Sequence, residues 1–140
     1  MNAKLLGLLA ACLMCAALSA RAEATLYAAL GERAGIAGLA EDLVGRLKSD
    51  SRTKVFFKDT NAKNLAEQLR DQVCAVVGGP CVYEGATMAK SHADLGIGMA
   101  DYLAVVELLQ DAMDAKHLPF SVQNDVLARL APMYRDIVTR

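Results

Sequence analysis

The sequence predicts an all-α domain, and three observations support this prediction. Apolar side chains recur at steps of three and four residues in several separate segments, the spacing that places them on one face of a helix. Sustained alternation of apolar and polar residues, which would predict strands, is not found along the 140 residues. Glycine and proline separate the helical segments. We therefore expect about five or six helices, without internal repeats.

The first 22 residues are expected to lie outside this domain. Lys4 opens a short basic segment, residues 5–20 are almost wholly apolar, and Ala20-Arg21-Ala22 fits a small-x-small cleavage site. These features are typical of a secretory signal peptide, and an apolar run of about 16 residues is too short to predict a membrane span. We expect a signal peptide at 1–22 and a mature domain at 23–140, exported to the periplasm.

Export also determines what the cysteines are expected to do. Leu9-Ala10-Ala11-Cys12 resembles a bacterial lipobox, so the alternative to cleavage after Ala22 is a lipid on Cys12 that anchors the chain to a membrane. Cys74 and Cys81 remain in the mature chain, on either side of a Gly-Gly-Pro sequence. An oxidising compartment favours a disulfide that closes this short loop, whereas the alternative is two free thiols.

The charge balance argues against a nucleic-acid partner. The chain contains 15 basic and 16 acidic residues, and two of the basic ones, Lys4 and Arg21, belong to the expected leader. The mature chain therefore has 13 basic residues against 16 acidic ones, a net charge of −3. Without a basic patch, nucleic-acid binding is not predicted, and the remaining length suits one domain with a modest core.

Apolar stripes predict the helices of the first half. Residues 25–30 form a short apolar helix that ends near Gly31. A longer helix runs from about 35 to 49, and another begins after a cap at Thr60 or Asn61 and ends at Gly78-Gly79-Pro80. The apolar faces of these two longer helices consist of Ile36, Leu39, Leu43 and Leu47, and of Leu65, Leu69, Val73 and Val76.

The second half begins with a short helix from about 86 to 94, which Gly96 ends. A longer helix follows, and His117-Leu118-Pro119 separates it from a last helix that Ser121 is expected to cap and Pro132 to kink. The apolar faces of these two helices consist of Tyr102, Val105, Val106, Leu109 and Met113, and of Val122, Val126, Leu130, Met133 and Ile137.

His92 is the residue that raises the question of a cofactor. It shares a helix face with Met88 and Leu95, so its imidazole points where apolar side chains point. A haem requires an apolar slot, an axial base and polar groups for its carboxylates. Lys63 and Lys90 are available for the carboxylates. The alternative is a hydrogen-bonded histidine of the core.

Four segments, taken in order, resemble the group I truncated haemoglobins, small globins with a two-over-two helical sandwich. The resemblance covers nearly the whole mature chain and is carried by LYAALGERAGI (26–36), FFKDTNAKNL (56–65), GGPCVYEGATMAKSHADLGI (78–97) and LAPMYRDIV (130–138). It implies that His92 is the proximal ligand of the haem iron and that Phe57 packs flat against the porphyrin. It further implies a pocket lined by Phe56, Thr60, Leu65, Tyr83, Met88, Ile97 and Tyr102.

The chain departs from the family on the opposite side of the haem. Many members stabilise bound O2 with a tyrosine and a glutamine, and at these positions this chain has Val44 and Leu69. Gln72 shares the face of Leu69, so we expect it as a substitute distal group. The alternatives are Gln68 at the rim, or two solvated glutamines. We expect an apolar distal pocket with an open or water-bound sixth position and fast O2 release.

The resemblance implies a globin that reversibly binds O2, NO or CO at ferrous haem b. The haem would be held non-covalently, because the Cys-x-x-Cys-His sequence of c-type attachment is absent. One alternative is an NO dioxygenase, which would need an external reductase because this sequence has no flavin or nicotinamide motif. Another is a haem-free helical interaction module. His117, in a connection beside Leu118-Pro119, is expected to have no role at the iron.

Overall fold

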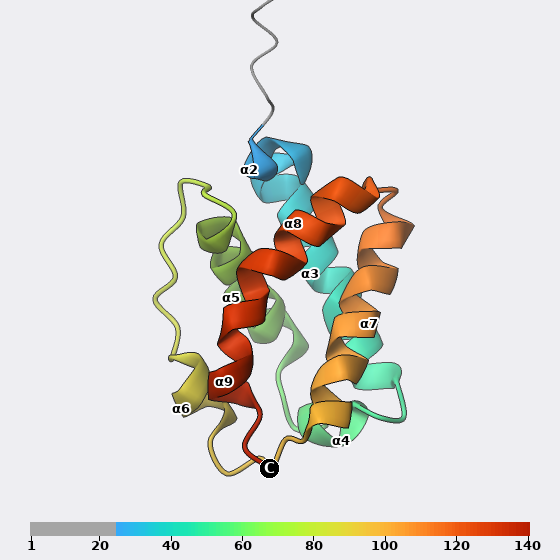
Figure 1. Cartoon of the computed structure of the whole chain (residues 1–140), viewed down its shortest axis with the longest axis vertical. Helices are drawn as coiled ribbons and strands as arrows, with labels where there is room; N and C mark the ends of the chain where they lie inside the picture. Colours follow the sequence, from blue (N-terminus) through green and yellow to red (C-terminus); the bar gives the residue numbers. More distant parts are fainter. Residues whose placement is uncertain (1–24) are drawn as a thin grey trace, which may run out of the picture.

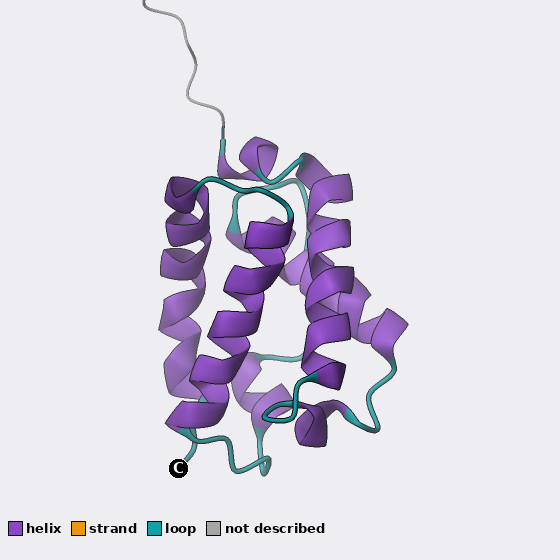
Figure 2. Cartoon of the chain, turned by 90° about the vertical axis from the view of Figure 1, so that its right-hand side faces the viewer, coloured by secondary structure: helices purple, strands orange, loops and turns teal. Residues whose placement is uncertain are grey.

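The computed structural model describes residues 25–140 and confirms the all-α prediction (Figure 1). The predicted signal peptide and Cys12 lie outside these residues. Throughout the described range the regular elements are helical and loops join them (Figure 2). None of the helices in this range is long and apolar enough to cross a membrane.

The helices follow the predicted order. The chain passes through α2, α3, α4 and α5, at Leu26–Ala29, Glu32–Ser49, Lys54–Phe57 and Ala62–Val76. It continues through α6, α7 and α8, at Met88–His92, Met99–Ala115 and Phe120–Leu130. A 3₁₀ turn, η2 at Ala131–Met133, then leads into α9 at Tyr134–Ile137.

The helix ends test several predictions made from the sequence. Asn61, not Thr60, caps α5, since its side-chain oxygen accepts a hydrogen bond of 2.9 Å from the Asn64 amide. The expected kink at Pro132 is confirmed, because α8 gives way to the 3₁₀ turn that contains this proline. The capping role expected of Ser121 is wrong: α8 already begins at Phe120, after Pro119, so Ser121 lies inside the helix.

The core forms where α3 packs against α5 and α7. α3 crosses behind the α8–α9 segment, with α5 on one side of that segment and α7 on the other (Figure 1). α3 packs with α5, and α7 packs with α8. These two helix pairs form the two-over-two arrangement expected from the sequence. The predicted apolar stripe of α3 is buried throughout, and the side chains that meet it include Val73, Leu109, Met113 and Val126. The core thus lies between the long helices, whereas α4 and α6 lie at its margin.

A disulfide joins the end of α5 to the segment that leads to α6. Cys74 and Cys81 are bonded, which confirms the disulfide expectation over free thiols. The turn between them needs glycine: Gly78 has a φ of +83°, and a Cβ on Gly79 would come within 2.5 Å of the Tyr27 ring. The glycine pair therefore lets the chain reverse closely against α2 on its way to His92.

Candidate functional site

His92 is the last residue of α6, and its ring is fixed by the helix that carries it. The helix begins at Thr87, whose hydroxyl oxygen accepts a hydrogen bond of 3.2 Å from the Lys90 amide. The Nδ1 atom of His92 lies 2.8 Å from the Met88 carbonyl oxygen and 3.2 Å from Ser91 Oγ. Because a carbonyl oxygen only accepts, this contact requires Nδ1 as the donor, and in the neutral imidazole Nε2 is then the unprotonated nitrogen. This is the tautomer that can bind a metal through Nε2.

Gln72 is a buried polar residue beside this helix. It lies on α5, is 9% exposed, and donates from Nε2 to Met88 Sδ at 3.1 Å. The same nitrogen lies 3.7 Å from Met133 Sδ, in the turn before α9. Gln72 is thus on the inward face of α5, as expected. In this structure its amide is engaged by residues of α6 and η2, and its predicted distal role stays a prediction.

Aromatic side chains of α7 and α9 meet near the same end of the molecule. The rings of Tyr102 and Tyr134 are 5.3 Å apart and nearly perpendicular, at 77°. Burial raises the pKa of the Tyr102 hydroxyl and the neighbouring Tyr134 raises it further, so this group stays protonated at neutral pH. The chain between α6 and α7 is held here as well, since the buried Ile97 accepts a hydrogen bond of 3.0 Å from the Thr139 amide.

The predicted phenylalanines lie on α4, and a lysine of α3 holds this segment. Lys48 Nζ donates to the carbonyl oxygens of Phe57 and Thr60, at 2.8 and 2.7 Å. Phe57 is half-buried and packs against the core. Lys48 was not among the site residues predicted from the sequence. A basic residue in the last turn of a predicted helix was the available signal, because such residues often bind nearby carbonyl groups.

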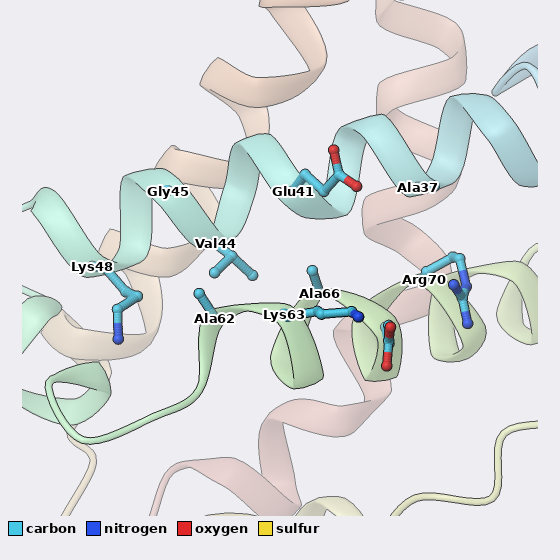
Figure 3. Close-up of a pocket in the computed structure, with 10 residues that line it drawn as sticks. Ala37, Glu41, Val44, Gly45, Lys48, Ala62, Lys63, Ala66 and Arg70 are labelled. Carbon is cyan, nitrogen blue, oxygen red and sulfur yellow. The ribbon is translucent and has the colours of Figure 1, made fainter.

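The two positions predicted to face the ligand lie on the long helices. Val44 on α3 is 3% exposed, and Leu69 on α5 is half-buried against the core. Val44 faces α5 across a groove of about 440 Å³, where Lys63 also lies (Figure 3). Neither Leu69 nor His92 lines this groove. It is therefore a feature of the α3–α5 contact and is separate from the surroundings of His92.

The remaining predicted pocket residues are half-buried or buried. Most are half-buried, on or near α4, α5, α6 and α7, namely Phe56, Thr60, Leu65, Tyr83, Met88 and Tyr102. The Tyr83 hydroxyl donates to the Ala86 carbonyl oxygen at 2.9 Å. His117 is exposed. It follows the C-terminal end of α7, whereas Tyr102 lies near the N-terminal end of that helix.

These residues fit a haem. The donor set is one imidazole with an available Nε2, which suits an axial ligand to haem iron. Half-buried apolar and aromatic side chains are found on several helices, and Met88 contacts His92 directly, which suits a large flat apolar cofactor. Lys90, on α6 itself, is exposed and available for a carboxylate.

Comparison with known proteins decides the family. Residues 25–139 match the family model described as bacterial-like globin. The chain belongs to the bacterial-like globins. Within that family this globin is a group 1 truncated haemoglobin, as the sequence resemblance implied. The family matches nearly all of the residues that the structure describes.

Individual relatives agree with this assignment. The globin is 29% identical over 116 residues to a group 1 truncated haemoglobin from Mycolicibacterium paratuberculosis, a match that covers 83% of this chain and 85% of the relative. It is 29% identical over 89 residues to one from Tetrahymena thermophila, covering 64% and 74% of the two chains.

Solved structures share its fold. The truncated haemoglobin from Tetrahymena pyriformis in the Fe(III) form superposes with a TM-score of 0.79 at 22% identity, over 83% of this chain and 99% of that one. The 2/2 haemoglobin from a Synechococcus species, in the cyanomet state with covalently attached heme, gives 0.77 at 23% identity, over 84% and 100%. At these identities the likeness establishes the fold.

Proposed function

We propose that this globin binds haem b non-covalently, with His92 as the axial ligand, and reversibly takes up O2, NO or CO. The observation that carries the proposal is the bond from His92 Nδ1 to the Met88 carbonyl oxygen, which leaves Nε2 available on a half-buried face. When bound, haem supplies a ferrous iron whose sixth position can accept a diatomic gas.

The chain's own residues would hold and orient the cofactor. Phe57 and Thr60 lie on a segment that Lys48 fixes, so one wall of the slot is set by α3. Met88 and Tyr102 add half-buried surface from α6 and α7. Lys90 and Lys63 are the cations proposed for the haem carboxylates. Lys63 would have to turn away from the α3–α5 groove to reach them.

The distal side is proposed to be apolar. Val44 and Leu69 replace the tyrosine and glutamine of many relatives, so neither position supplies a hydrogen-bond donor. Loss of such a bond in a dry pocket costs on the order of 1–1.5 kcal/mol, or about tenfold in affinity. We therefore favour a gas-binding protein with fast O2 release over the NO dioxygenase alternative, which requires stabilised O2 and an external reductase.

We also propose that the protein is exported to the periplasm. The Cys74–Cys81 disulfide is the kind of bond that persists in oxidising compartments such as the periplasm. It is therefore consistent with a signal peptide at residues 1–22. The alternative, a membrane-anchored form with a lipid on Cys12, requires the same compartment.

The absorption spectrum of the purified protein, with and without His92→Ala, tests the proposal. We expect a Soret band in the parent protein that shifts on adding O2, CO or NO to the reduced form, and loss or marked weakening of that band in the variant. His117→Ala is the matched control, because it removes the other histidine from an exposed position. An unchanged spectrum in His92→Ala, or a parent protein that binds no added haemin, would contradict the proposal.

A further inference from the structure

α6 is too short and too exposed to hold its own position. It has five residues, and each of them is exposed or only half-buried. A helix of this length has little stability in isolation, so its orientation depends on bonds to the rest of the molecule. Since His92 is its last residue, whatever fixes α6 also fixes the imidazole.

Gln72 provides one of these bonds from the core. Its side chain is 9% exposed, and its Nε2 atom donates to Met88 Sδ at 3.1 Å. The second contact, to Met133 Sδ at 3.7 Å, links the same amide to the turn before α9, the helix that packs against α6. A thioether is a weak acceptor, but a buried amide that loses its partners is costly, so this arrangement resists displacement of Met88.

Met88 connects this amide to the proximal histidine. Its sulfur accepts from Gln72, and its carbonyl oxygen accepts from His92 Nδ1 at 2.8 Å. A displacement of Met88 would therefore move its carbonyl oxygen, which accepts the hydrogen bond from His92 Nδ1 and so orients the imidazole. The geometry thus links α5 to the ring of His92 through one residue.

We propose that Gln72 is a positioning residue for the proximal histidine, acting through Met88. This inference rests on the proposed role of His92 as axial ligand. It gives Gln72 a role on the proximal side, in place of the distal hydrogen bond expected from its helix face. The two roles are distinguishable, because one acts on the iron–histidine bond and the other on the bound gas.

Amide hydrogen exchange in the haem-free protein tests the link without the cofactor. In Gln72→Leu, which keeps the approximate volume, we expect exchange at residues 88–92 to rise by about three- to tenfold, the effect of one lost hydrogen bond. Gln110→Leu, the same change at an exposed position on α7, should leave these residues unaffected. Unchanged exchange at residues 88–92 in Gln72→Leu would overturn the proposal, whatever the spectrum of the loaded protein.

The iron–histidine stretching band in the resonance Raman spectrum of the ferrous protein tests the consequence. We expect Gln72→Leu and Met88→Leu each to shift this band and to speed haem loss. The double variant should do no more than either single one, because both remove the same bond. A faster O2 dissociation rate in Gln72→Leu with an unshifted band would assign Gln72 to the distal side. If exchange rises as expected but His92→Ala leaves the haem spectrum unchanged, the proposed axial ligand fails while the link itself stands.

Discussion

The α3–α5 wall and the proximal segment, residues 78–97, are built in different ways. The wall consists of two long helices in extensive contact, and the apolar stripe of α3 is buried along it, with Val44 only 3% exposed. The proximal segment contains one helix of five residues, α6, between irregular stretches (Figure 1). It is held by a disulfide, a buried amide and the turn at Gly78 and Gly79.

This difference separates two ways in which a substitution can act. On the wall, many apolar contacts share the stabilisation, so a side chain of similar volume can be exchanged without moving the backbone. In the proximal segment a few individual bonds determine where His92 lies, so the loss of one changes its surroundings. Gas affinity should therefore depend on the chemistry of the wall, and haem retention on the links of the proximal segment.

Removing the disulfide should have the largest effect on the proximal segment. In Cys74→Ala/Cys81→Ala we expect the free energy of unfolding to fall by about 2 kcal/mol, the usual value for so short a closed loop. Denaturant titration measures this change. Reduction of the parent protein should give a similar loss, and faster haem release should accompany both. An unchanged unfolding midpoint would show that the bond does not constrain the segment.

Adding a donor to the wall should have a smaller effect, on the gas alone. Leu69→Gln restores the residue type found in many relatives at nearly constant volume, so we expect O2 dissociation to slow by about tenfold. Stopped-flow measurement of the O2 off-rate tests this. Leu103→Gln, at a position that is 49% exposed, is the control. Equal off-rates in the two variants would contradict an apolar distal pocket.

The smallest expected effect is electrostatic and concerns the stability contributed by Asp71, on α5 just before the proximal segment. Hydrogen bonding from Arg70, with a further contribution from Arg33, lowers the pKa of Asp71. Arg33 also donates to Cys81 Sγ at 3.3 Å. Because the folded-state pKa is depressed, the contribution is present at neutral pH and is lost as the pH falls through that value.

Asp71→Asn should therefore weaken the loss of stability on acidification, by a small amount because the pair is partly exposed. Unfolding midpoints measured between neutral and acid pH test this prediction. Asp111→Asn, on the exposed face of α7, is the control. The same dependence of the unfolding midpoint on pH in both variants would show that Asp71 does not contribute to it.

Periodicity predicted the long helices but not the one-turn helix α4. The stripe of Ile36, Leu39, Leu43 and Leu47 repeats often enough to define a face, and every member is buried. The four residues of α4 were not predicted as a helix, because one turn shows no period. The role of Lys48 could not be predicted either, since the carbonyl groups it binds become neighbours only when the chain folds.

The sequence by itself determined the all-α class, the order of the helices and the family resemblance, because these depend on local spacing and on motifs, whereas it left open whether Cys74 and Cys81 are bonded. It also placed Gln72 on the inward face of α5. Only the tertiary structure decided what lies opposite that face. Helical spacing gives the direction of a side chain but not the neighbour it meets, and here the neighbour is Met88, whose carbonyl oxygen holds the ring of His92.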